Sequence, residues 1–327
     1  MINLYGRLTF LGWIPTIFTI ISRYTWILKN YYCWTRSEEG MDHHQVPKKK
    51  DFLLLLPALL PLLLIFVIPL VNGILLTFQS NGQPGFSLGN YIRFFTESQY
   101  YTTIFKTLLL VVPASILELI VAFAIAYYLR GKFKGKSLIA GLVIFPLTLG
   151  SLIVDMGIIV FFKPNGWFNQ FLIGAGIIDE PIKLIYNFWG AFIALFILGV
   201  AFLASNFIGM MDSIDPNLEQ AAKSLGASGW TAFWRVFYPL IRSSILTIYA
   251  LNLIMQLGVY TSAVIVGNPA SETRTFAVAA FEEAMRNFDY GMANTIAIVM
   301  AVTQLICLSI VYRLRQRGYV GSAATFK

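Results

Sequence analysis

The sequence predicts an all-α protein that crosses a membrane several times. Hydrophobic residues make up 57% of the 327 residues and charged residues only 12%, with a mean hydropathy of +0.69. Soluble domains carry about twice that share of charged residues. The net charge of +8 does not indicate nucleic-acid binding, because the basic residues stand at the ends of apolar runs and form no single patch.

Six apolar runs are each long enough to cross a bilayer of about 30 Å. They predict spans at 52–78, 103–129, 137–162, 188–211, 244–266 and 291–312. Fourteen basic residues flank these spans on one side, against six on the other. Because basic loops stay in the cytoplasm, we expect both ends of the core and the connector 213–241 to be cytoplasmic.

The first fifty residues form an N-terminal extension of uncertain type. The apolar stretch Leu8 to Leu28 contains Pro15 and Arg23. It is a seventh span, an interfacial helix or neither of these, and the sequence leaves the three alternatives open. An alternative start at Met41 gives a short basic leader, in which His43 and His44 are expected to be solvated. The expected units are therefore 1–50, a first span with its outer loop at 51–102, a core at 103–315 and a tail at 316–327.

The connector 213–241 is a polar segment with helix signals at both ends. Asp215 is expected to cap a helix that begins at Pro216 and ends at Gly226. A second helix is expected to open at Ser228 or Gly229 and to stop at Pro239. The segment is either a docking element or merely a hairpin that links two spans.

The residues of this connector resemble the EAA loop of ABC importer permeases. Gln220-Ala221-Ala222, three residues, then Gly226-Ala227, with Pro239 in the tail, follow the Glu-Ala-Ala, Gly pattern. The resemblance implies a coupling helix that sits in a cleft of a cytoplasmic ATPase, with contacts from Glu219, Gln220, Ala221, Ala222, Gly226 and Ala227. Gln220 occupies the usual Glu position, and the neighbouring Glu219 could replace that carboxylate only in part.

The resemblance extends over about residues 103 to 315, which are similar to the core of type I ABC importer permeases. It implies three partners besides the lipid bilayer, namely a cytoplasmic ABC ATPase dimer, a second permease subunit and an extracytoplasmic solute-binding protein. It also implies a bacterial plasma (inner) membrane location. The Leu225-Gly226-Ala227-Ser228 version of the loop resembles polyamine, iron, sulfate and phosphonate permeases. A polyamine or a similar small charged solute is the favoured substrate, and a sugar is the alternative.

Polar residues within the apolar runs predict where a solute would pass. The candidates are Asp155 in the third span and, recurring every fourth residue in the fifth, Asn252, Gln256 and Tyr260. Glu118 in the second span is a weaker candidate, and Asn206 lies late in the fourth. Hydrogen bonding between helices explains such residues equally well, so a route-lining role and a purely structural role both stay open.

Enzymatic chemistry has no support in the sequence. No phosphate-binding glycine loop, HExxH, CxxC or serine nucleophile elbow occurs, and Cys33 and Cys307 lie far apart without metal-ligand spacing. We expect no cofactor and no metal site, and we expect ATP hydrolysis to belong to separate chains. An ion-coupled carrier and a structural subunit without a transport route remain as alternatives; a carrier would be expected to show internal repeats.

Overall fold

The computed structural model describes residues 61, 63–79, 86–131, 133–215 and 217–317. The chain divides into two compact units, Met1–Val67 and Ile68–Lys327. Of the first unit only Pro61 and the π-helix η1, Leu63–Val67, are described. The expectations for 1–50, with Cys33, His43 and His44, and for most of the tail 316–327 lie outside the described residues.

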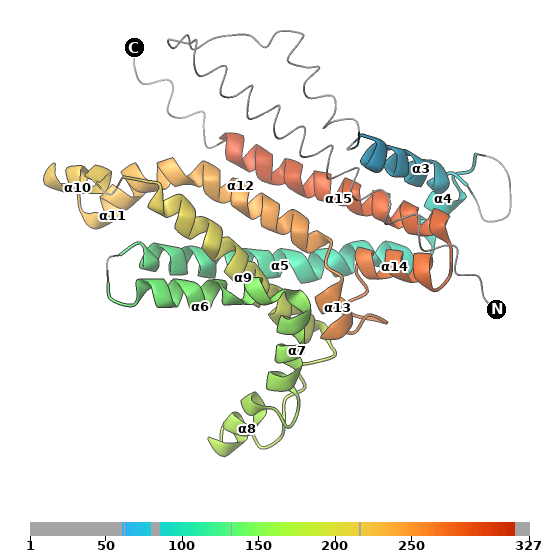
Figure 1. The fold of residues 1–327 in the computed structure, drawn as a ribbon, viewed down its shortest axis with the longest axis horizontal. Coiled ribbons are helices and arrows are strands. Elements are labelled where there is room, and N and C mark those ends of the chain that lie inside the picture. The colour runs from blue at the N-terminus through green and yellow to red at the C-terminus, as the bar shows by residue number, and fades with distance from the viewer. Residues whose placement is uncertain (1–60, 62, 80–85, 132, 216, 318–327) are drawn as a thin grey trace, which may run out of the picture. The chain divides into compact units, whose positions relative to one another are not determined.

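Every regular element of the second unit that the structure describes is helical (Figure 1). The elements are α3 Ile68–Thr77, α4 Gly89–Thr96, α5 Ser98–Leu129, α6 Lys136–Leu149, α7 Ser151–Phe162, α8 Trp167–Gly174, α9 Phe188–Asp212, α10 Asn217–Ser224, α11 Gly229–Ala232, the π-helix η2 Phe233–Phe237, α12 Tyr238–Leu257, α13 Thr261–Ile265, α14 Phe276–Met285 and α15 Tyr290–Arg317.

Four helical stretches among the described residues are long and apolar enough to cross a membrane. They are Ser98–Leu129, Phe188–Asp212, Gly229–Leu257 and Tyr290–Arg315, and a bent pair of helices raises the total to five. The spans predicted at 103–129, 188–211 and 291–312 are thereby confirmed in place and type. Only the second half of the span predicted at 52–78 is described, as η1 and α3.

The spans predicted at 137–162 and 244–266 are interrupted rather than continuous. The span predicted at 137–162 bends by 106° between Lys136–Leu149 and Ser151–Gly174. The bend occurs at Gly150, which has φ +76° and ψ 160°, a conformation that essentially only glycine adopts. In the fifth, α12 ends at Leu257, and Gly258 to Tyr260 separate it from α13. Apolar periodicity does not reveal such breaks inside an apolar run.

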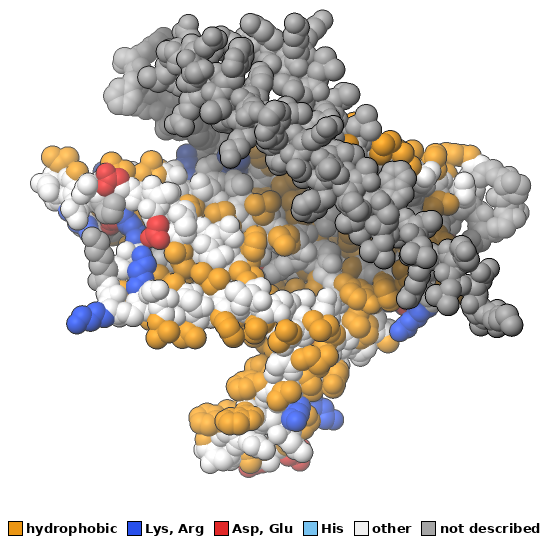
Figure 2. Space-filling view, viewed as in Figure 1, with side chains coloured by type: hydrophobic (Ala, Val, Ile, Leu, Met, Phe, Trp, Pro, Cys, Tyr) orange, Lys and Arg blue, Asp and Glu red, His pale blue; other side chains and the backbone are white. Residues whose placement is uncertain are grey.

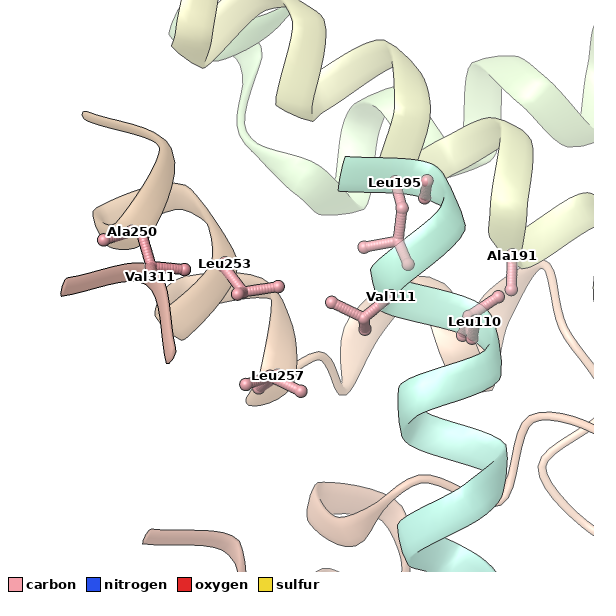
Figure 3. Packing of buried hydrophobic residues seen from close by; sticks show 9 residues of the cluster. Leu110, Val111, Ala191, Leu195, Ala250, Leu253, Leu257 and Val311 are labelled. Atoms are coloured by element: carbon pink, nitrogen blue, oxygen red, sulfur yellow. The ribbon is translucent and has the colours of Figure 1, made fainter. Parts of the chain in front are cut away.

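The helix α9 lies at the centre of the second unit and packs against α5, α6 and α12. Figure 3 shows one of the apolar clusters that hold these helices together, with residues of α5, α9, α12 and α15. It contains Leu110, Val111, Ala114, Ala191, Leu195, Ala250, Leu253, Leu257 and Val311. A second cluster around Phe207, Met211, Phe237 and Ile241 joins α5, α9 and α12 near the hairpin.

Charged contacts fasten the helices at the opposite end from the hairpin. Arg93 in α4 binds Asp289 at 3.1 Å, and the Tyr100 hydroxyl in α5 donates to Glu283 in α14 at 2.8 Å. The helix α14 lies in the segment between the fifth and sixth spans, where no helix was predicted. These contacts tie α4 and α5 to α14 and α15.

The visible surface of the helices is largely apolar (Figure 2). Charged side chains gather over α10 and α11 and beside α8, at the ends of the helices. Large side chains such as Phe105, Leu142 and Leu305 are more than 60% exposed along α5, α6 and α15. A surface of this kind is stable in lipid, which does not penalise exposed apolar groups as water does.

Candidate functional site: a cytoplasmic hairpin and an intramembrane cavity

The connector folds into the expected helix, turn and helix. The Asp215 carboxylate accepts the Asn217 N–H at 2.9 Å and so caps α10. At the other end, Gly226 has φ +89°, and the Ala227 N–H bonds back to the Ala222 carbonyl at 3.1 Å. This six-to-one bond with a left-handed glycine is the Schellman arrangement, which satisfies carbonyls at a helix end. Backbone hydrogen bonds and the glycine conformation thus define the turn.

The second arm of the hairpin differs from the prediction at its end. Ser228 caps it as expected, accepting the Thr231 N–H at 3.2 Å. The arm does not stop at Pro239, however, but continues through η2 into α12 up to Leu257. The Tyr238 N–H bonds to the Phe233 carbonyl, five residues back, and this wider turn directly before the proline accommodates its ring without ending the helix.

The predicted docking residues differ in where they point. Gln220, Ala221 and Gly226 are exposed, whereas Ala222 and Ala227 are half-buried against the rest of the hairpin. Two large apolar side chains that were not singled out are also exposed, Leu225 by 90% and Trp230 by 73%. The exposed groups of the hairpin thus include glutamine, alanine and large apolar side chains beside charged ones such as Lys223, and exposed apolar groups often mark a protein contact surface.

Glu219 does not point outward with Gln220. Its carboxylate binds the Arg130 guanidinium at the end of α5 and lies 3.7 Å from Lys223 Nζ. Only 13% of the Glu219 side chain is exposed. The expectation that Glu219 partly replaces the missing outward carboxylate finds no support in this geometry, because the carboxylate is already paired within the chain.

A cavity of about 370 Å³ opens beside the break in the fifth span. Its wall comes from α6, α7, α9, α12 and α13, and it contains three of the four residues predicted for a solute route, Asn252, Gln256 and Tyr260. Ser151, Thr261 and Ser262 add hydroxyl groups. Tyr260 was expected on the same helical face as the two amides; it lies instead in the break and still reaches the cavity.

Behind the two amides lies Glu118, which is completely buried in α5. Gln256 Nε2 donates to both Glu118 carboxylate oxygens at 2.8 Å, and Asn252 Nδ2 donates to Oε2 at 2.8 Å. We call Glu118, Asn252 and Gln256 the amide–carboxylate cluster. Sequence reasoning ranked Glu118 low because nothing in the chain signals its contact with residues more than 130 positions away.

One acceptor of this cluster has no partner. Both Gln256 N–H bonds are directed at Glu118, so Gln256 Oε1 is left buried without a hydrogen bond in the described part of the chain. Gln256 also lines the cavity. Gly199 in α9 faces the cluster so closely that an added methyl group would overlap the Glu118 carboxylate. The cluster is therefore tightly enclosed, and it holds one buried oxygen acceptor without a partner among the described residues.

The remaining polar candidates have other surroundings. Asp155 in α7 is fully buried and accepts the Ser262 hydroxyl at 2.9 Å, so it stands behind the cavity wall and holds Ser262 in place. Asn206 donates to the Phe202 carbonyl of its own helix at 2.8 Å and takes no part in the cavity wall. Cys307 is a free, partly buried thiol.

Comparison with known proteins identifies the family. Residues 118–318 match the model of the "binding-protein-dependent transport system inner membrane component" family. The chain belongs to this family. The match covers the amide–carboxylate cluster, the hairpin and all helices from α6 to α15, so the resemblance to ABC importer permeases is confirmed. The protein is a multi-pass membrane component of a transport system.

Individual relatives carry different solutes in their names. The chain is 29% identical over 75% of its length to the sulfate transport system permease protein CysW of Synechococcus elongatus, covering 82% of that protein. It is 25% identical over 68% of its length to the spermidine/putrescine permease PotB of Escherichia coli, covering 81% of it. A crystallised bacterial alginate ABC transporter matches in fold, with a TM-score of 0.72 and 19% identity over 82% of this chain and 96% of that one.

Proposed function

We propose that this chain is the transmembrane subunit of an ATP-driven importer, in which the hairpin 213–241 receives the motion of a cytoplasmic ATPase dimer. A second permease subunit completes the membrane part, and an extracytoplasmic binding protein delivers the solute. The observation that carries the proposal is the hairpin with its capped helices and hydrogen-bonded turn, in a chain of this permease family. A stiff element is needed because a flexible loop would absorb the ATPase motion.

The outward face of the hairpin supports its role in docking. Gln220 and Ala221 are exposed on α10, and Leu225 and Trp230 expose large apolar surfaces at the turn and in the second arm. Exposed apolar groups at a cytoplasmic end, away from lipid, are stabilised when a protein partner covers them. With glutamine at the position that is usually glutamate, docking here would depend on packing and amide hydrogen bonds rather than on an ion pair.

The cavity supports the passage of a small solute with hydrogen-bond donors, and a polyamine-like cation fits best. Ser151, Thr261 and Ser262 line the cavity with hydroxyl groups that can accept hydrogen bonds, and Glu118 places a carboxylate directly behind the two amides. The described residues that line the cavity include no Lys, Arg or His. A cationic amine would supply donors to this wall and would be favoured by the nearby negative charge.

Sulfate is a second candidate because CysW and several other relatives are named sulfate permeases. The structural feature that favours it is the N-terminus of α7, a helix of 12 residues whose first residue, Ser151, lines the cavity. Unpaired N–H groups and hydroxyls at such an end attract anions. Spermidine is a cation and sulfate an anion. The two candidate solutes are therefore distinguished by testing which of them stimulates transport.

The test is solute-stimulated ATP hydrolysis and uptake by the complex reconstituted in lipid with its genomic neighbours. Spermidine and sulfate are offered separately, each with its binding protein. Asn252→Ala should lower uptake about tenfold, because it removes a hydrogen bond to a buried carboxylate. The control is Asn206→Ala, which removes an amide of the same kind outside the cavity wall and should leave uptake unchanged.

Three results would count against parts of the proposal. If no ATPase co-purifies and uptake follows an ion gradient, the importer assignment fails. If the Asn252→Ala complex assembles and transports normally, the cavity is not the solute route. If sulfate rather than spermidine stimulates hydrolysis, the cationic substrate is wrong and the sulfate candidate replaces it.

A further inference from the structure

Arg130 occupies a position between the two arms of the hairpin. It follows directly on α5, and its Nη1 atom pairs with Glu219 Oε2 on α10. The carbon atom of the same guanidinium lies 4.1 Å from the centre of the Phe237 ring, which belongs to η2 in the second arm. A single side chain at the end of α5 therefore contacts both arms.

The Arg130–Glu219 pair is shielded from solvent more than the neighbouring ion pair between Lys136 of α6 and Asp212 of α9. Its side chains are 16% and 13% exposed, compared with 32% and 54% for Lys136 and Asp212. Exposed ion pairs contribute little to stability because water and salt screen the attraction between their charges. The charges of shielded pairs attract each other more strongly. The guanidinium is also held over an aromatic ring, which adds a cation–π attraction.

The rest of α10 is weakly anchored. Its extensive contacts within the described residues are with α11 and η2, the second arm of the hairpin, and not with α5 or α9. The pair with Arg130 thus gives α10 a direct connection to α5. Along the chain, the hairpin is covalently continuous with α9 and α12 only. The ion pair with Arg130 links it to a third helix, α5, which is distant in sequence.

We infer that Arg130 and Glu219 form a strut that transmits hairpin motion to α5, so that α5 moves together with α9 and α12. The same helix carries Glu118, twelve residues before Arg130 and therefore about 18 Å along its axis. Because α5 then moves with α12, the Glu118 carboxylate keeps its hydrogen bonds to Asn252 and Gln256 while the hairpin moves. Arg130 and Glu219 are positioning residues in this scheme, which rests on the importer function proposed above.

The strut is tested in the complete transporter in lipid, by measuring solute transported per ATP hydrolysed. Arg130→Gln and Glu219→Gln should each lower this ratio about threefold or more, because residues that share an ion pair are coupled energetically by at least about that factor. The exchanged pair Arg130→Glu with Glu219→Arg should recover much of the loss, because it restores opposite charges. Full recovery is not expected, since the cation over Phe237 is lost.

Lys136→Gln is the matched control, because it removes the more exposed pair with Asp212 at the same end of the helices. It should leave the transport ratio essentially unchanged. Co-purification of the ATPase is measured for each variant. A variant that retains the ATPase still folds and docks, so a lowered ratio in that variant reflects lost transmission of motion. Retained ATPase together with a lowered ratio and recovery in the exchanged pair is the result that the strut predicts.

Two results would overturn the strut while leaving the importer function intact. One is an unchanged ratio in both single variants. The other is loss of the ATPase from both single variants, which would make the pair a docking or folding requirement. The unmodified complex is measured first, and an absence of solute-stimulated hydrolysis there would overturn the proposed function itself, and the strut with it.

Discussion

Glu118 depends on side chains from a distant part of the chain. A fully buried carboxylate is costly unless it is hydrogen-bonded, and the amides of Asn252 and Gln256 supply three such contacts. The close approach of α9 at Gly199 completes the enclosure. At the scale of single residues, the cluster is stable only because α5, α9 and α12 meet at this point.

This enclosure predicts that Gly199→Ala is destabilising. The added methyl group would overlap the Glu118 carboxylate and the Gln256 amide, and overpacking of this kind costs about 1–3 kcal/mol. The thermal midpoint of the purified protein should fall. Gly209→Ala, in the same helix, is the control because nothing lies within 4 Å of its added carbon. Equal midpoints for the two variants would contradict the observed packing.

Sequence reasoning favoured two members of the cluster and ranked their partner, Glu118, lower. Asn252 and Gln256 stand out because their spacing places them on one helical face, and both line the cavity. Glu118 lies in another helix, and a pattern within one helix carries no information about which helix faces it. Arg130 escaped notice for a related reason, because it looked like one of several basic residues that set the topology.

At the scale of elements, the hairpin was largely predictable because its ends are set by local chemistry. Asp215, Gly226 and Ser228 act through backbone hydrogen bonds within a few residues, so their types alone indicate their roles. The prediction that the second arm ends at Pro239 was wrong, because the π-turn before it removes the steric clash between the proline ring and the preceding turn that normally ends a helix. The break at Gly150 was missed because an apolar run looks the same whether its helix is straight or bent.

The turn at Gly226 predicts a specific coupling defect. Gly226→Val places a β-branched residue at φ +89°, where the left-handed conformation costs about 1–2 kcal/mol, equivalent to a five- to thirtyfold change in an equilibrium. The two arms would lose their fixed angle, and transport per ATP should fall. Gly229→Ala, at a helical glycine with free space around it, should leave coupling intact. Normal coupling in Gly226→Val would argue against a rigid lever.

At the scale of the whole molecule, charge and apolar surface together define an orientation. The hairpin and the turn between α5 and α6 lie at the same end of the helices (Figure 1), and Lys136 of α6 reaches Asp212 of α9 there. Basic residues concentrate in both segments, and the positive-inside rule assigns such segments to the cytoplasm. The proposed docking of an ATPase on the hairpin and the charge distribution thus require the same side of the membrane.

This orientation predicts which loops a membrane-impermeant thiol reagent can reach. In a chain with Cys33 and Cys307 replaced by serine, Glu180→Cys should be labelled in intact cells, because Glu180 is exposed in the segment between α8 and α9. Lys134→Cys, exposed between α5 and α6, should be labelled only after the membrane is permeabilised. The reverse pattern would place the hairpin outside the cell, where no ATP-driven subunit could dock, and would exclude coupling through Gly226 and Arg130 alike.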